Sequence, residues 1–216
     1  MTTSTPKKSG SFSKDDVASL QQSVRKDGCW VFFRRNIKAI SQKKSVVITE
    51  LGCGMGANVI LSKRIPNIKT YFCIDASEDM LEYVRREQIS YAKTLCVDLD
   101  TKNYALPKSD IVLAKFLFHH ISNKQRLLEK IHASLAKDGV VLIIDKFPKR
   151  WGIVYEKLLH TTRIRKQLGV HYYINQQDFE SLCEAAGFSV SKEKVVVGKK
   201  LKNCHIYKVF YVLKKQ

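Results

Sequence analysis

The chain has 216 residues, of which 44% are hydrophobic, and a formal net charge of +18. This length and hydrophobic content predict one compact domain with small additions. The sequence contains no run of about 18 apolar residues, so we expect no membrane-spanning helix. Residues 1–13 are rich in Ser, Thr and Lys and have no apolar core, so we expect a disordered lead-in rather than a secretory signal.

The positive charge lies toward the two ends of the sequence. Residues 1–44 have 10 basic and 3 acidic side chains, residues 45–145 have 13 and 12, and residues 146–216 have 15 and 5. Such flanks suit an acidic partner, for example RNA, an anionic lipid surface or a phosphorylated substrate. We favour a solvated lysine-rich surface, because most of the basic residues are Lys, a less specific phosphate ligand than Arg.

The six cysteines lie at positions 29, 53, 73, 96, 183 and 204, without a CxxC pair or a metal-ligand spacing. Several of them stand in apolar runs, where cysteine behaves as a small hydrophobe. This usage indicates a reducing, cytoplasmic compartment, with no structural disulfide and no bound metal.

In chain order, the sequence first predicts an N-terminal helical cap over residues 14–44, whose aromatic residues either close over a ligand or pack in a core. Five apolar runs then predict strands over residues 46–51, 70–75, 94–97, 110–114 and 140–145, with helices between them. Ser77 is the predicted N-cap of one helix. Ser122 and Gln125 form the predicted capping box of another, which we expect to end at Gly139.

Beyond residue 145 the pattern changes. Residues 147–175 are basic and aromatic and have no strand signal, and residues 177–186 predict a helix that ends at Gly187. Residues 188–197 and 205–213 predict two strands with a short connection, which favours an antiparallel hairpin. The alternating strands and helices upstream predict an α/β fold with a doubly wound, mostly parallel sheet and helices on both faces.

A glycine-rich loop follows the first predicted strand. Gly52, Gly54 and Gly56 alternate after an acidic residue, Glu50, and lead into a helix whose free N–H groups can face a nucleotide-like ligand. The looser dinucleotide pattern is also met, because Ala57 follows and an acid occurs near the required distance, so NAD remains an alternative. Glu50, a second strand-end acid and the lack of a second domain argue against NAD.

Together these residues resemble the class I S-adenosylmethionine-dependent methyltransferases. The resemblance rests on the glycine loop with Glu50, on Asp75, on Asp98-Leu99, and on Phe118-His119-His120, and it covers roughly residues 45–145. It implies a seven-stranded sheet whose last strand is antiparallel, and a cofactor-binding domain over residues 45–216. The implied cofactor is S-adenosyl-L-methionine.

The resemblance also implies roles for particular residues. An acid before the glycine loop attracts the ammonium group of the cofactor, the glycines admit its methionine and ribose parts, and the later acids accept hydrogen bonds from the ribose and the adenine. The alternative for the later acids is an ordinary strand-end turn. The implied cofactor-binding residues are Glu50, Gly52, Gly54, Gly56, Asp75, Ala76, Met80, Asp98, Leu99, Lys115 and Phe116.

Candidate catalytic residues follow the fourth predicted strand. His119 or His120 could act as a general base, since histidine titrates near neutral pH. Alternatively, one of these histidines caps the next helix and the other packs beneath it.

Residues 147–175 lie where the family often inserts a substrate lid. The residues predicted to contact the substrate are Trp151, Tyr155, His160, His171 and Tyr172. The alternative is a surface helix and loop whose aromatic side chains pack at the edge of the core.

The sequence therefore predicts a cytoplasmic methyltransferase that modifies an O or N atom of a small-molecule acceptor, with anionic and aromatic molecules as the candidates. No Asn/Asp-Pro-Pro-Tyr/Phe motif follows the fourth strand, and no cysteine lies there, which disfavours methylation of DNA bases and of pyrimidine rings. Two alternatives stay open: an RNA methyltransferase with phosphate-binding flanks, and a cofactor-binding protein without methyl transfer.

Overall fold

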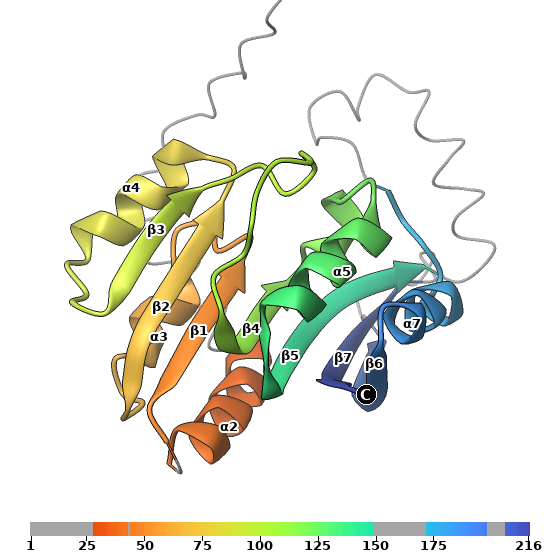
Figure 1. Cartoon of the computed structure of the whole chain (residues 1–216), viewed down its shortest axis with the longest axis horizontal. Helices are drawn as coiled ribbons and strands as arrows, with labels where there is room; N and C mark the ends of the chain where they lie inside the picture. The colour runs from red at the N-terminus through yellow and green to blue at the C-terminus, as the bar shows by residue number, and fades with distance from the viewer. Residues whose placement is uncertain (1–27, 43, 149–171, 198–205) are drawn as a thin grey trace, which may run out of the picture.

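The computed structural model describes residues 28–42, 44–148, 172–197 and 206–216. The strands that it contains are β1 (Val46–Leu51), β2 (Ile68–Asp75), β3 (Ala92–Cys96), β4 (Ser109–Lys115), β5 (Leu135–Pro148), β6 (Phe188–Val197) and β7 (Ile206–Lys215). They form one seven-stranded sheet in the order β3-β2-β1-β4-β5-β7-β6 (Figure 1). The order reverses direction at β1, because the chain first builds outward through β2 and β3 and then returns to add β4.

The sheet is mostly parallel, as predicted. Strands β1 to β5 pair in parallel, whereas β7 pairs antiparallel with both β5 and β6. The predicted fold class and the C-terminal antiparallel hairpin are therefore confirmed. The carboxyl ends of β1, β2, β4 and β5 meet at one edge of the sheet, the position at which open α/β sheets bind ligands.

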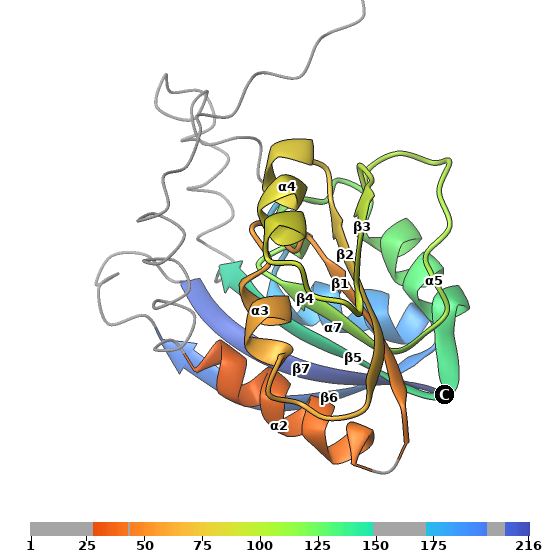
Figure 2. The same ribbon diagram turned by 90° about the vertical axis from the view of Figure 1, so that its left-hand side faces the viewer.

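Helices cover both faces of the sheet (Figure 2). Helices α2 (Cys29–Ser41), α3 (Ala57–Ser62) and α4 (Glu78–Arg86) pack on one face, whereas α5 (Lys124–Ser134) and α7 (Gln176–Ala185) pack on the other. A short 3₁₀ helix, η1 (Phe118–His120), joins β4 to the α5 region. None of these described helices has the length and apolar character needed to cross a membrane.

The first helix shares a core with the sheet. The side chains of Trp30, Phe32 and Phe33 are buried on α2 and pack with strand residues such as Phe210, whose ring lies 5.3 Å from that of Phe32. The packing interpretation of these aromatic residues is therefore the one observed. The division of the chain at residue 44 stays a prediction, as does the disordered lead-in, which lies outside the described residues.

The predicted N-cap at Ser77 is confirmed, because its hydroxyl accepts a hydrogen bond from the N–H of Met80. The predicted capping box at Ser122 is wrong. Asn123 is the N-cap of α5 and accepts the N–H of Arg126, whereas the hydroxyl of Ser122 donates to Asp100. The hydroxyl of Ser122 therefore does not cap the helix, because it donates to the carboxylate of Asp100, which is distant in sequence.

The predicted end of α5 at Gly139 is also wrong. The helix ends at Ser134, and Leu135 already pairs with Ser109 as the start of β5. A Cβ atom on Gly139 would lie 2.7 Å from the side chain of Leu135 and 3.0 Å from the carbonyl of Ala136. Glycine is needed at position 139 because the chain folds closely on itself there, rather than to terminate a helix.

Candidate functional site

The glycine loop connects β1 to α3 at the carboxyl edge of the sheet. Gly52, Gly54 and Gly56 all have positive φ angles, of 65°, 54° and 75°. A Cβ atom at Gly56 would lie 2.7 Å from the side chain of Val84 on α4. The loop therefore needs glycine both for its backbone conformation and for the close packing of α4 against α3.

Asp75, at the end of β2, lies directly against this loop. One of its carboxylate oxygens accepts the N–H of Gly54 at 2.8 Å, and the other accepts the N–H of Ser77 at 3.0 Å. A carboxylate has about four acceptor positions, so these two bonds leave capacity for ligand hydroxyl groups. The structure thus places Asp75, which is predicted to accept hydrogen bonds from the ribose, against the glycine loop.

Glu50 is buried beneath the loop, with 3% of its surface exposed. Its carboxyl group accepts hydrogen bonds from Asn58 Nδ2 at 2.6 Å and from the hydroxyl of Tyr71 at 2.8 Å. Burial raises the pKa of Glu50 to about 7, although both hydrogen bonds and the charge of Lys115 oppose this shift. The carboxyl group is therefore poised between its neutral and charged forms near neutral pH.

Asn58 was not predicted as a site residue. Its side chain is buried on α3, and its Nδ2 atom donates to Glu50, whereas its Oδ1 atom accepts no hydrogen bond from any residue that the structure describes. Buried acceptors are normally paired, so an orphaned one beside a ligand loop indicates a donor that belongs to the ligand. An ammonium group fits this position, because Asn58 Oδ1 and the carboxyl of Glu50 are both acceptors.

The predicted adenine-binding residues follow β3. Asp98 is exposed and accepts the N–H of Asp100 at 2.9 Å, whereas Leu99 is buried and its carbonyl accepts the hydroxyl of Tyr104. The first of these bonds is the strand-end turn that the alternative interpretation predicts. The other two predicted adenine contacts come earlier in the chain, after the end of β2: Ala76 is exposed and Met80 is half-buried.

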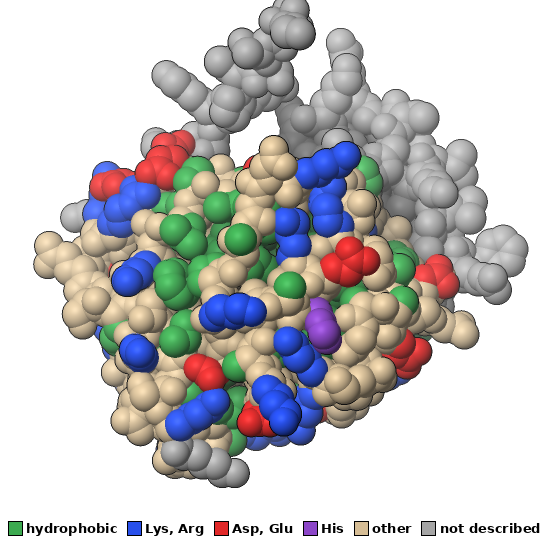
Figure 3. Space-filling model, in the orientation of Figure 1, with side chains coloured by type: hydrophobic (Ala, Val, Ile, Leu, Met, Phe, Trp, Pro, Cys, Tyr) green, Lys and Arg blue, Asp and Glu red, His purple; other side chains and the backbone are tan. Residues whose placement is uncertain are grey.

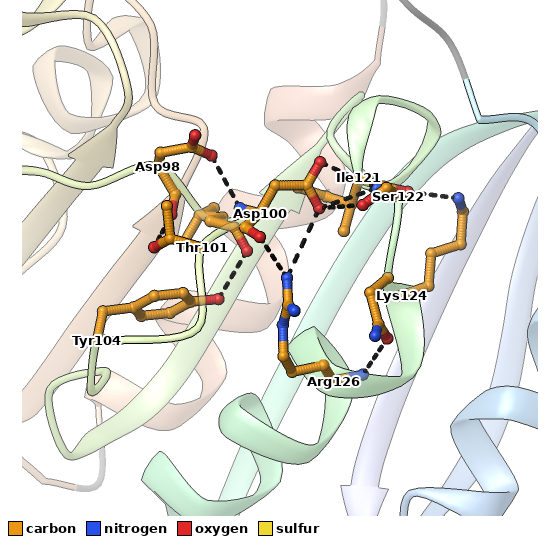
Figure 4. Close-up of polar contacts among 10 residues, drawn as sticks. Asp98, Asp100, Thr101, Tyr104, Ile121, Ser122, Lys124 and Arg126 are labelled. Atoms are coloured by element: carbon orange, nitrogen blue, oxygen red, sulfur yellow. Dashed lines mark hydrogen bonds and ion pairs between the residues drawn. The ribbon is translucent and has the colours of Figure 1, made fainter. Parts of the chain in front are cut away.

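A polar network holds this β3–β4 connection in place (Figure 4). The carboxylate of Asp100 accepts both the N–H and the hydroxyl of Ser122, and its backbone carbonyl accepts a guanidinium N–H of Arg126 at 2.5 Å. The two segments are 22 to 26 residues apart in sequence. The network therefore fixes the turn that contains Asp98 against the start of α5.

The structure distinguishes the two candidate histidines. His119 is buried, and its Nδ1 atom lies 2.6 Å from a carboxylate oxygen of Asp145 near the end of β5. Asp145 is completely buried and also accepts the N–H groups of Phe118 at 2.6 Å and Lys146 at 2.7 Å. His120 is exposed, with its ring 4.1 Å from that of His119. Sequence analysis did not single out Asp145, because other acidic residues also stand at the ends of predicted strands.

His119 is further held by the segment that follows residue 171. The N–H of Tyr172 donates to the carbonyl of His119 at 2.7 Å, and the ring of Tyr173 stacks on the imidazole at 5.5 Å. Lys124 donates to the carbonyls of Ile121 and Tyr172, and burial lowers its pKa to about 8. Of the predicted substrate residues, Tyr172 is 42% exposed beside this site. The others, Trp151, Tyr155, His160 and His171, lie outside the described residues.

Lys115 is the last residue of β4, and Phe116 follows it directly. The N–H of Phe116 donates to the carbonyl of Ile144 at 2.7 Å, and Phe116 has a positive φ of 53°. This conformation is rare for a bulky residue and is found chiefly at turns and functional sites.

Comparison with known proteins shows which proteins the sequence of this chain is similar to. Residues 49–141 match a family model described as a methyltransferase domain. A carboxy-S-adenosyl-L-methionine synthase of Actinobacillus succinogenes is 28% identical over 108 residues, which are 46% of this chain and 44% of that protein. An (S)-coclaurine N-methyltransferase of Thalictrum flavum is 28% identical over 116 residues, 51% of this chain and 32% of that protein. The chain thus spans less than half the length of these relatives.

Solved structures show the same fold over nearly the whole chain. The YcgJ protein of Bacillus subtilis aligns with a TM-score of 0.62 at 11% identity and covers 84% of this chain and 97% of its own. The plantazolicin methyltransferase BpumL aligns with a TM-score of 0.62 at 16% identity, covering 94% and 91%. Residues 49–141 are thus similar to a methyltransferase domain, and the fold of the chain is the one found in these solved structures.

Proposed function

We propose that this chain methylates an oxygen or nitrogen atom of a small-molecule acceptor, with His119 as the general base. The observation that supports this proposal is the buried hydrogen bond of 2.6 Å between His119 Nδ1 and Asp145. When bound, S-adenosylmethionine would supply an electrophilic methyl group, whose bond to the sulfonium breaks as the acceptor attacks and leaves S-adenosylhomocysteine. The acceptor atom must lose a proton as it bonds to this methyl group, and a positioned base is the group that removes it.

The His119–Asp145 pair suits proton removal. Asp145 already accepts two backbone N–H groups, and we assign it the same acceptor role toward His119, so that Nδ1 carries the proton and Nε2 faces the acceptor. When Nε2 takes the proton of the acceptor O–H or N–H group, Asp145 stabilises the imidazolium that forms. Asp145 is a positioning residue, because it acts on the reaction through His119.

We assign the cofactor contacts to residues whose surroundings fit each part of the molecule. Asn58 Oδ1 and Glu50 would accept hydrogen bonds from the ammonium group, and Asp75 would accept them from the ribose hydroxyls. Asp98 and Leu99 would face the adenine. The proposed binding residues that complete the set are Gly52, Gly54, Gly56, Ala76, Met80, Lys115 and Phe116.

Two observations favour a small molecule over RNA as the acceptor. Two proteins similar to this chain are, by name, methyltransferases of coclaurine and of plantazolicin. On the face drawn in Figure 3, basic and acidic side chains lie interspersed among uncharged ones. A phosphate backbone is better matched by a continuous stripe of basic residues.

Methyl-labelled S-adenosylmethionine tests the proposal directly. The whole chain is incubated with it and with a panel of small phenols, amines and carboxylates, and labelled product is measured. The substitution His119→Ala should lower product formation by roughly 10²-fold or more, in the range expected for the loss of a general base. His120→Ala should retain most of the activity. Equal losses in the two variants would contradict the assignment of the base.

A further inference from the structure

Lys124 is buried at a position that is unfavourable for a lysine in two respects. It is the first residue of α5, directly after the N-cap Asn123, and it is 7% exposed. The positive end of the helix dipole repels a cation in the first turn. Burial lowers the pKa of Lys124 to about 8, although attraction to the carboxylates of Asp145 and Asp100 opposes this shift. Proteins break such local rules mainly at functional sites, so the contacts of this side chain are informative.

The ammonium group of Lys124 joins two segments that are distant in sequence. Its Nζ atom donates to the carbonyl of Ile121 at 2.7 Å, a contact drawn in Figure 4, and to the carbonyl of Tyr172 at 2.5 Å. It also lies 6.0 Å from the centroid of the Tyr172 ring. Ile121 follows η1 directly, whereas Tyr172 is 48 residues beyond Lys124. Because hydrogen bonds from a charged donor are stronger than neutral ones, Lys124 holds Tyr172 against the end of η1.

Tyr172 and the residue after it both contact His119. The N–H of Tyr172 donates to the carbonyl of His119 at 2.7 Å, and the ring of Tyr173 lies parallel to the imidazole, within 6° and at 5.5 Å. Asp145 binds the Nδ1 edge of the same imidazole, so Tyr173 supports its face. Lys124 is therefore connected to His119 through a segment that packs on it.

We infer that Lys124 is a positioning residue for His119, because it holds Tyr172 and Tyr173 against the imidazole. The inference rests on the proposed function and adds a residue that acts on the reaction through its base. In this role Lys124 needs no contact with the acceptor or the cofactor. A misplacement of about 1 Å can slow a reaction by about 10²-fold, so the loss of this support should be measurable.

Chemical labelling of His119 tests the positioning without any acceptor. Diethyl pyrocarbonate modifies accessible, unprotonated imidazole nitrogens, and mass spectrometry of the digested full-length protein gives the rate at each histidine. Lys124→Met removes both hydrogen bonds to the carbonyls and should raise the rate at His119 by about tenfold or more, because the segment over the imidazole opens more readily. His120 is exposed and serves as the internal reference, with an unchanged rate.

Lys130→Met is the matched control. Lys130 is a half-buried lysine of the same helix that also donates to a carbonyl, that of Tyr104 at 2.5 Å, and its Nζ atom lies 4.3 Å from the centroid of the Tyr104 ring. It makes the same kinds of contact as Lys124, but to the β3–β4 connection. The labelling rate at His119 should therefore stay within about twofold of that in the unsubstituted protein.

Steady-state kinetics shows whether the support of His119 affects the reaction. With an acceptor found by methyl labelling, Lys124→Met should lower kcat by about tenfold or more, with changes below about threefold in KM and in S-adenosylhomocysteine affinity. In the His119→Ala background the same substitution should have no further effect, because a positioning residue acts only through the base. A purely structural role would instead give additive losses.

The results that overturn the inference are distinct from those that refute the proposed function. Equal His119 labelling in Lys124→Met and in the unsubstituted protein would overturn the inference, as would additive kinetic losses. If Lys124→Met does not fold, Tyr173→Leu removes the stacked ring alone, and unchanged labelling or additive losses in that variant would be equally decisive. Full activity in His119→Ala would refute the proposed base, and the role of Lys124 with it, whatever the labelling rates.

Discussion

His119 and Asp145 are joined by a buried hydrogen bond of 2.6 Å that connects the segment after β4 to the end of β5. The two residues are 26 positions apart, and both are at least 94% buried. Because β4 and β5 are parallel neighbours, their carboxyl ends meet at the same sheet edge. Through this hydrogen bond, Asp145 orients the imidazole of His119, the proposed base.

The substitution Asp145→Asn should separate orientation from binding. An amide can donate to His119 Nδ1 and thereby favour the wrong tautomer, so we expect kcat to fall by roughly 10²- to 10⁴-fold with little change in KM or in cofactor affinity. The measurement is steady-state kinetics with an acceptor found by methyl labelling. Asp138→Asn, an exposed acid on the same strand, is the control. A kcat within about threefold of the unsubstituted protein would contradict the assigned role.

Glu50 should make stability depend on pH. Its pKa in the folded protein is about 7, above the ordinary value of 4.5, so the folded state binds the proton more tightly than the unfolded state. Stability therefore falls as pH rises from about 4.5 to about 7, by a free energy on the order of 3 kcal/mol, and levels off above that range. Chemical denaturation across this pH window measures the slope.

Glu50→Gln should remove most of this slope, since the amide stays neutral at every pH in the window. We also expect weaker binding of S-adenosylhomocysteine, because the variant loses the charge that would attract its ammonium group. Glu129→Gln, at an exposed position on α5, should keep the slope and the affinity. A pH slope that survives in Glu50→Gln would show that another group produces it.

The glycine loop allows a graded test of packing. Gly56→Ala places a Cβ atom 2.7 Å from the side chain of Val84 and forces a positive φ on alanine, so we expect a loss of about 2–4 kcal/mol in stability. Gly54→Ala meets no atom within 4 Å and should cost only about 1–2 kcal/mol from its backbone angle. Thermal unfolding of the two variants gives the comparison, and a larger loss for Gly54→Ala would contradict the packing argument.

Asp75→Asn should weaken S-adenosylhomocysteine binding by about tenfold or more, because one amide oxygen replaces two acceptors that serve the loop and the proposed ribose contact. Calorimetric titration measures the affinity. Asp79→Asn, an exposed acid in the first turn of α4, is the matched control. Unchanged affinity in Asp75→Asn would place the ribose elsewhere.

Local patterns were sufficient to predict most of the fold. Alternating apolar runs and glycines located the strands, and β1 and β6 have the predicted bounds. The errors arose where a distant partner altered the local preference. Asp100 takes the hydroxyl of Ser122, and the close approach of Leu135 explains Gly139.

The candidate site was only partly predictable for the same reason. Asp75 could be placed because its spacing from the glycine loop is itself a pattern. Asn58, Tyr71 and Asp145 could not, since their importance depends on which buried atoms they meet across the sheet.

Titration with S-adenosylhomocysteine, followed by thermal unfolding, tests whether the chain binds the proposed cofactor. A ligand that binds only the folded state adds about 2.7 kcal/mol of stability at a concentration of 100 Kd. For a chain of this size that corresponds to a rise of about 5–10 °C in Tm. We expect such a rise for the unsubstituted protein and a smaller one for Asp75→Asn. No change in Tm at millimolar S-adenosylhomocysteine would contradict it.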